Sequence, residues 1–125
     1  MASGTTTKKV VIVEDDKALA NVLEDKLQSE GFSVTKAVNG EEGLAVIKTV
    51  KPNLIILDLM MPVMGGQAML HRLRNIPEFK LLPVIVLTNA GDIENLEEAH
   101  YLNAYFFIKS NVSLEEIVKS VQDLT

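Results

Sequence analysis

Four short runs of apolar residues recur along this chain, and each ends in a polar residue or a turn. The runs lie at 9–13, 54–58, 81–88 and 105–109, and the segment 32–37 alternates apolar with polar residues. Continuous apolar runs are typical of strands in a parallel sheet, because helices cover both faces of such a sheet. Alternation is typical of a strand near the sheet edge. The pattern therefore predicts five strands.

Between these segments, apolar residues recur at intervals of three and four, which is the spacing of one buried face on a helix. Five helices are predicted, with these apolar positions: Leu19, Val22, Leu23 and Leu27; Leu44, Ile47 and Val50; Met69, Leu70 and Leu73; Ile93, Leu96 and Ala99; and Leu114, Ile117, Val118, Val121 and Leu124. On the third of these helices, Arg72 and Arg74 are predicted to face water.

Residues that start and stop helices support this division of the chain. An aspartate after the first strand can cap the first helix, and Gly31 can close that helix as the residue after its C-cap. Gly65-Gly66 opens the third helix and Pro77 ends it. Ser113 and Glu116 have the spacing of a capping box at the start of the last helix.

Strands that alternate with helices need right-handed crossovers, which place helices on both faces of a parallel sheet. We therefore expect an α/β fold: a doubly wound, five-stranded parallel sheet of flavodoxin-like order 2-1-3-4-5, with five helices on both faces. No repeat or linker divides the chain. Residues 9–125 are thus predicted to form one domain, after a flexible N-terminal tail at residues 1–8.

Charge and composition narrow the functions that such a fold can carry. The chain has 125 residues, a net charge of −5 and no cysteine. Direct nucleic-acid binding is disfavoured, because it needs a basic face. No apolar run reaches membrane-spanning length, and no secretory signal is evident. Without cysteine there are no disulfides or thiolate metal sites, and a cytoplasmic location is the simplest expectation.

Polar residues follow the predicted strands at the points where they end. Glu14 and Asp15 follow the first strand, Asp58 ends the third, and Thr88 and Lys109 end the fourth and fifth. In the expected strand order the first and third strands are neighbours, and ligands bind in the crevice above their carboxyl ends. Carboxylates this close repel one another unless a cation compensates them, and Mg²⁺ prefers oxygen ligands. The sequence therefore predicts a Mg²⁺ site at Glu14, Asp15 and Asp58.

An aspartate beside a metal, a hydroxyl and an ammonium group has what an aspartyl phosphate needs. Asp58 can act as a nucleophile toward phosphorus, while Mg²⁺, Thr88 and Lys109 neutralise charge on the phosphoryl oxygens. Each of these residues alone is unremarkable at a strand end. Together, their complementary charges and hydroxyl favour phosphoryl transfer to Asp58.

These motifs resemble those of the response-regulator receiver domains of two-component phosphorelays, over nearly the whole chain from residue 9 to residue 124. Val11-Ile12-Val13-Glu14-Asp15-Asp16 looks like the family's first-strand acidic motif. Asp58-Leu59-Met60-Met61-Pro62-Val63-Met64-Gly65-Gly66 looks like its phosphoacceptor motif. Thr88 and Lys109 match the remaining signature positions.

The resemblance implies a signalling phosphoacceptor, not an enzyme, that assists its own phosphorylation and dephosphorylation. The site residues that it implies fall into three groups: the catalytic Asp58, Lys109 and Thr88; the metal-binding Glu14, Asp15, Asp58 and Met60, the last through its backbone carbonyl; and the switch residues Thr88 and Phe106. The phosphoryl donor would be a histidine kinase or a histidine phosphotransfer protein. Phosphorylation would switch the surface formed by the fourth helix, fifth strand and fifth helix. A downstream effector protein or domain would bind that surface. This domain itself would bind neither nucleic acid nor membrane directly. A homodimer on phosphorylation is compatible with the family.

Four positions depart from the family's pattern: Gly65, Asn89, Asn103 and Ser110. Ser110 stands where the family usually has a proline, so the sequence leaves open whether the peptide bond before it is cis. Met60 and Ala90, two residues after Asp58 and Thr88, flank the path of the water that hydrolyses the phosphoryl group in receiver domains, and both are apolar. Polar side chains there can orient that water, so these two residues predict a long-lived phosphorylated state.

Three other protein classes fit parts of the pattern. A haloacid-dehalogenase-like phosphatase would need a second aspartate two residues after Asp58, where this chain has Met60. A flavodoxin-like flavin carrier would need a phosphate cradle after the first strand, and the acids there would repel the flavin phosphate. A receiver-like docking module that is not phosphorylated is the main alternative, although it has no need to keep Asp58, Thr88 and Lys109 together.

Overall fold

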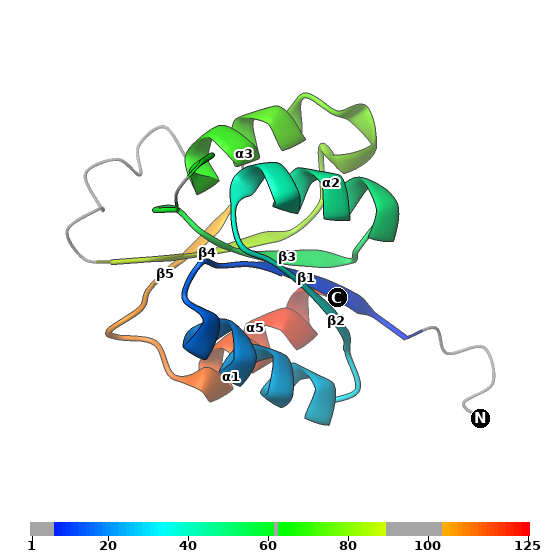
Figure 1. Cartoon of the computed structure of the whole chain (residues 1–125). Helices are drawn as coiled ribbons and strands as arrows, with labels where there is room; N and C mark the ends of the chain where they lie inside the picture. The colour runs from blue at the N-terminus through cyan, green and yellow to red at the C-terminus, as the bar shows by residue number, and fades with distance from the viewer. Residues whose placement is uncertain (1–6, 62, 90–103) are drawn as a thin grey trace.

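The computed structural model describes residues 7–61, 63–89 and 104–125, and its five strands form one parallel sheet (Figure 1). The strands are β1 (Lys9–Val13), β2 (Ser33–Ala37), β3 (Leu54–Asp58), β4 (Val84–Thr88) and β5 (Tyr105–Ile108). Their order across the sheet is β2-β1-β3-β4-β5, and every pair of neighbours is parallel. The predicted doubly wound order is therefore confirmed.

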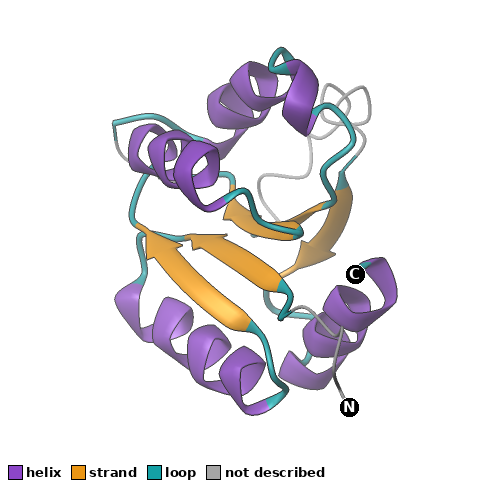
Figure 2. Ribbon diagram, turned by 90° about the vertical axis from the view of Figure 1, so that its right-hand side faces the viewer, coloured by secondary structure: helices purple, strands orange, loops and turns teal. Residues whose placement is uncertain are grey.

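Helices lie on both faces of the sheet, as the crossovers require. One face carries α1 (Lys17–Ser29) and α5 (Leu114–Leu124), and the other carries α2 (Gly40–Val50) and α3 (Gly66–Arg74) (Figures 1 and 2). The helix predicted after Asp92 lies outside the described residues. None of the helices in the described part of the chain is long and apolar enough to cross a membrane.

Alternate residues of the strands belong to two apolar cores, one on each face of the sheet. Val10 and Ile12 pack on the side of α1 and α5, whereas Val11 and Val13 pack on the side of α2 and α3. All five residues of β3 and all five of β4 are buried, as the continuous apolar runs predict. Because these strands are fixed by burial on both faces, the polar groups at their ends are held in place.

The helix ends follow the signals in the sequence. Asp16 is the N-cap of α1, and its side chain accepts two backbone hydrogen bonds from the first turn. Gly31 follows the end of α1 with φ at 94°, a left-handed conformation in which a side chain would be strained. Ser113 and Glu116 form the predicted capping box of α5. Gly65 caps α3 without a side-chain hydrogen bond.

Two predictions about helix faces are wrong. Val22 is 50% exposed, because the buried face of α1 is centred on Leu23. Arg74 does not face open water. Its Nη1 donates to the carbonyl that ends the 3-10 turn η1 (Pro77–Phe79), at 2.9 Å, and to that of Leu82, at 2.7 Å. The arginine thereby satisfies carbonyl groups in the connection to β4, which helical periodicity does not reveal.

Candidate functional site

The strand registers bring four of the predicted site residues to one edge of the sheet. The register between β1 and β3 places Glu14 beside Asp58. The registers of β4 and β5 bring Thr88 and Lys109 to the same edge, where the Lys109 N–H donates to the Thr88 carbonyl at 2.8 Å. The peptide bond before Ser110 is trans, as are the others in the described residues. The topology therefore brings Glu14, Asp58, Thr88 and Lys109 together.

Three carboxylates converge at this edge. One ligand oxygen each from Glu14, Asp15 and Asp58 lies within 4.8 Å of the other two. The side chains of Glu14 and Asp58 are buried, whereas Asp15 is exposed at the mouth of the crevice. Hard oxygen ligands at this spacing, with one side open to solvent, fit Mg²⁺, which usually keeps several of its waters.

The two oxygens of Glu14 differ in their surroundings. Oε2 accepts a hydrogen bond from the backbone N–H of Asp16 at 3.2 Å, which fixes the orientation of the carboxylate. Oε1 is fully buried, and the ammonium group of Lys109 lies 3.0 Å away without forming a well-aligned hydrogen bond to it. A buried carboxylate oxygen with one charged partner and no aligned hydrogen bond is only partly compensated, and coordination of a cation would add to that compensation. This oxygen is therefore compatible with a metal in the site.

Lys109 bridges the two buried acids. Its Nζ lies 3.0 Å from Glu14 Oε1 and 3.3 Å from Asp58 Oδ2. One ammonium group balances only part of the charge of three carboxylates. A divalent cation would balance the remainder, so the lysine and a metal are complementary occupants of the crevice.

The pKa values of two residues in the crevice reflect this crowding. Burial raises the pKa of Glu14 to about 7, with a further rise from Asp58 and an opposing effect from the ammonium group of Lys109. Burial on its own would lower the pKa of Lys109, but the carboxylates of Glu14 and Asp58 outweigh burial and raise that pKa above its ordinary value. Near neutral pH, Lys109 is therefore charged and Glu14 is poised between its two protonation states.

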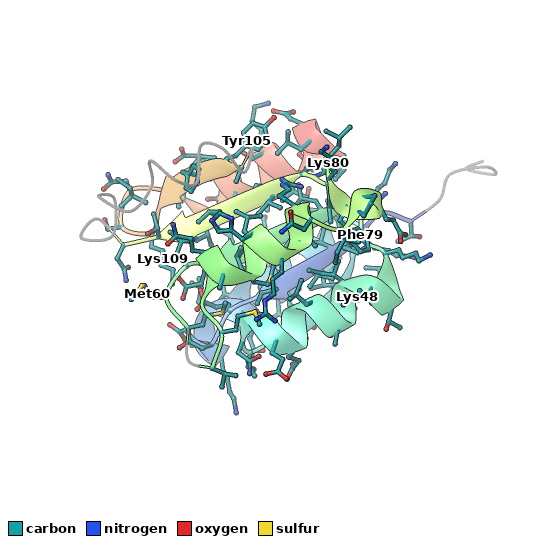
Figure 3. The ribbon with its side chains drawn as sticks, turned by 90° about the horizontal axis from the view of Figure 1, so that it is seen from above. Lys48, Met60, Phe79, Lys80, Tyr105 and Lys109 are labelled. Atoms are coloured by element: carbon teal, nitrogen blue, oxygen red, sulfur yellow. The ribbon has the colours of Figure 1, made fainter. Side chains whose placement is uncertain are left out.

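Met60 lies on the connection from β3 to α3, two residues after Asp58. Its backbone N–H donates to Asp58 Oδ1 at 3.3 Å, and its side chain is 59% exposed at the same edge of the molecule as Lys109 (Figure 3). The amide contact orients the carboxylate whose other oxygen faces Lys109. The use of the Met60 carbonyl as a metal ligand stays a prediction.

Thr88 and Phe106 lie on one face of the sheet. Thr88 is 1% exposed and ends β4, two residues after Val86, so the two side chains point to the same face. Phe106 pairs with Val86 across the strands and packs against the same core, on the side of α2 and α3. This arrangement is compatible with the predicted switch pair. Ala90, which was predicted to flank the water path, lies outside the described residues.

Gly66 has a part at the site that its predicted place at the start of a helix does not reveal. The Gly66 N–H donates to the Leu59 carbonyl at 2.8 Å, and a Cβ atom on Gly66 would lie 2.2 Å from the Asp58 carbonyl oxygen. No side chain fits there. The glycine pair was the available signal, since glycine often marks a close approach of two backbone segments.

Comparison with known proteins gives a consistent result. Residues 10–122 match the family model described as the response regulator receiver domain. A probable transcriptional regulator, ycf27, from Cyanophora paradoxa is 31% identical over 117 residues, which cover 94% of this chain and 48% of the relative. The DNA-binding dual master transcriptional regulator RpaA of a Synechocystis strain is 30% identical over 116 residues, covering 93% and 48%. The chain spans about half the length of these curated relatives.

Solved structures resemble the same region. The chemotaxis response regulator CheY4 of Vibrio cholerae is 28% identical and superposes with a TM-score of 0.86, over 96% of this chain and all of that one. The similarity thus covers nearly the whole chain.

Proposed function

The chain belongs to the family of response regulator receiver domains, and from this we propose that it is a phosphoacceptor that carries a signal on Asp58. The observation that supports the proposal best is the Asp58 carboxylate itself. One of its oxygens faces the ammonium group of Lys109 at 3.3 Å, and the other accepts from the Met60 N–H at 3.3 Å. A carboxylate held between an ammonium group and a backbone N–H donor, beside two further acids, is oriented to attack a phosphoryl group.

The transfer step follows from this geometry. An oxygen of Asp58 attacks phosphorus in line with the leaving nitrogen of a phosphohistidine. An oxygen–phosphorus bond forms, the phosphorus–nitrogen bond breaks, and the histidine ring recovers its lone pair and takes a proton. Lys109 and the hydroxyl of Thr88 bind the phosphoryl oxygens, on which negative charge is spread. The domain thereby assists its own phosphorylation. In dephosphorylation, water attacks phosphorus, the bond between phosphorus and the Asp58 oxygen breaks, and inorganic phosphate leaves, with the same side chains binding the phosphoryl oxygens.

Mg²⁺ is the cofactor that fits this site. Glu14, Asp15 and Asp58 would hold it, together with the Met60 carbonyl, and when bound it neutralises charge on the transferring phosphoryl group. Support comes from the spacing of the three acids and from the charge that remains when the ammonium group of Lys109 is set against three carboxylates. The residues present therefore fit the ion that the family requires.

We assign the switch to Thr88 and Phe106. When Thr88 turns its hydroxyl toward the phosphoryl group, it vacates space on the face of the sheet that Phe106 shares. The surface around β5 and α5 would change with it, together with the predicted helix after Asp92, which lies outside the described residues. The negative charge added at Asp58 would thus change a surface that lies away from Asp58 and that a partner can bind.

The partners follow from the same assignment. A histidine kinase or histidine phosphotransfer protein supplies the phosphoryl group, and an effector protein or domain reads the switched surface, with a homodimer on phosphorylation as one form of output. Residues 9–125 act as the receiver domain in the cytoplasm, after a tail at residues 1–8. The net charge of −5 argues against direct nucleic-acid or membrane contact by this domain.

Phosphorylation by acetyl phosphate tests the proposal. In Mg²⁺, intact-mass measurement should show one added phosphoryl group on the wild type and on Asp25→Ala, which removes an exposed acid of α1. Asp58→Ala should show none. A wild type that stays unmodified by acetyl phosphate and by histidine kinases would instead favour the docking module without phosphorylation.

A further inference from the structure

A contact between α2 and the connection from β3 to α3 lies next to the acidic crevice. The Gly40 N–H donates to the Met64 carbonyl at 2.9 Å. We call residues 59–61 and 63–66 the acceptor loop, because they follow Asp58 directly. Gly40 is the first residue of α2, so the start of this helix is joined to the acceptor loop by a backbone hydrogen bond.

The contact is too close for any side chain at position 40. A Cβ atom on Gly40 would lie 2.7 Å from the Met64 carbonyl oxygen, 2.9 Å from Met64 Cγ and 3.0 Å from Met69 Cβ. Gly40 does not have a positive φ, so alanine suits its backbone conformation. The glycine is therefore required by the approach of the loop. Replacing it changes that approach without straining the helix.

The acceptor loop is also fixed at its other end and strained in between. The Gly66 N–H donates to the Leu59 carbonyl at 2.8 Å, and Gly66 rests on the backbone of Asp58. Between the two contacts, Val63 has φ at 69°, a left-handed conformation that is unfavourable for a β-branched residue. Strain of this kind persists only where surrounding contacts hold it. The hydrogen bond from Gly40 to Met64 is one such contact.

From this geometry we propose that Gly40 is a positioning residue for the metal site, holding the acceptor loop so that Met60 keeps its place beside Asp58. The inference rests on the proposed function, because it concerns the Mg²⁺ site assigned there. Mg²⁺ demands nearly ideal ligand geometry, so a loop displaced by a few tenths of an ångström binds it less well. Partners that orient metal ligands are commonly worth 10-fold to 100-fold in affinity.

A matched control separates positioning from ordinary packing. Gly43 lies in the same helix, and a Cβ there would lie 3.0 Å from Met69 Sδ and 3.0 Å from each Cγ of Val13. Gly43→Ala therefore crowds the core beside α2 without touching the acceptor loop. Both variants are expected to lower the melting temperature, but only Gly40→Ala displaces the loop.

The test is the Mg²⁺ dissociation constant, measured by titration calorimetry on the wild type, Gly40→Ala and Gly43→Ala, with backbone amide shifts recorded for each. We expect Gly40→Ala to bind Mg²⁺ about 10-fold more weakly, with shifted amides at Leu59 and Met60, and Gly43→Ala to bind within about twofold of wild type. Phosphorylation of Gly40→Ala by acetyl phosphate should need correspondingly more Mg²⁺. Its extent should reach that of the wild type when Mg²⁺ is saturating.

Equal Mg²⁺ affinity in Gly40→Ala and wild type would overturn the inference, as would equal weakening in both glycine variants. If Gly40→Ala does not fold, Met64→Gly loosens the loop instead, because glycine gives the backbone more freedom at the point where its carbonyl accepts from Gly40. Unchanged Mg²⁺ affinity in that variant would overturn the inference equally. A wild type that binds no Mg²⁺ would instead contradict the proposed function on which the inference rests.

Discussion

The ammonium nitrogen of Lys109 lies 3.0 Å from Oε1 of Glu14, although the two residues follow strands at different places in the sheet. Glu14 follows β1 and Lys109 follows β5, and two strands, β3 and β4, separate these in the sheet order. The ion pair therefore spans the crevice above the carboxyl ends of β3 and β4, where Asp58 and Thr88 lie. It joins the two sides of the site.

Removal of this ammonium group should destabilise the fold. Lys109→Met leaves two buried carboxylates without their cation, and we expect a loss on the order of 2 kcal/mol, since breaking a buried pair costs more than breaking an exposed one. Lys119→Met is the matched control, because Lys119 forms an exposed pair with Asp123 within α5 and should cost less than about 0.5 kcal/mol. Urea denaturation of both variants measures the difference. Equal losses of unfolding free energy would show that the contacts of Lys109 with Glu14 and Asp58 stabilise the fold no more than an exposed ion pair does.

Mg²⁺ should stabilise the native protein, because the acids converge only when it is folded. At tenfold excess over its dissociation constant, the gain is about 1.4 kcal/mol, visible as a higher melting temperature. Asp15→Asn should reduce the gain, since it removes the exposed ligand at the mouth of the crevice. A melting temperature that does not change across millimolar Mg²⁺ would contradict the metal site.

The raised pKa of Glu14 predicts how stability depends on pH. Its pKa rises from 4.5 in the unfolded chain to about 7 in the folded protein, so the folded state binds the proton more tightly. Without metal, stability is therefore lost as pH rises from about 4.5 to about 7, by on the order of 3 kcal/mol. In Glu14→Gln this loss is absent. Thermal melts of both proteins from pH 5 to pH 8 without metal should diverge as pH rises, and parallel curves would refute the assignment.

The lifetime of the phosphorylated state should depend on Met60. Its side chain is exposed beside Asp58, so a polar replacement can reach the water that attacks phosphorus. Met60→Asn, Ala90→Glu and the double variant should lose the phosphoryl group faster than wild type, with an oriented water worth up to about 10²-fold in rate. Decay in excess Mg²⁺ measures this effect. Equal rates in all four proteins would show that these positions do not control the water, for example because Asn89 does so.

The strands were predictable because each is governed by burial. The apolar run of β3 coincides with the strand, whereas β4 begins at Val84 and not at Leu81, which is 82% exposed. The polar residues that end these runs reach one edge of the sheet once the strand order is known. The sequence therefore predicts that Glu14 and Asp58 are neighbours. The difference in protonation between these two acids is not predictable from the sequence, because the pKa of Glu14 depends on how deeply its side chain is buried.

Contacts between distant backbone segments were not predictable. The hydrogen bond from Gly40 to Met64 joins the start of α2 to the loop before α3. The distance between these two segments depends on how α2 and α3 pack on the sheet. Arg74 was assigned to water by helical periodicity, yet it donates to carbonyls in the connection to β4. Periodicity describes a helix face and carries no information about carbonyl groups that lie beyond the end of the helix.

The most direct test of the account is to identify the modified residue. Borohydride reduces an aspartyl phosphate to homoserine, so the protein is phosphorylated in Mg²⁺, reduced, digested and sequenced by mass spectrometry. We predict homoserine at position 58 and at no other aspartate, including Asp15. Homoserine at another acid, with Asp58 unmodified in a phosphorylated protein, would contradict the central claim.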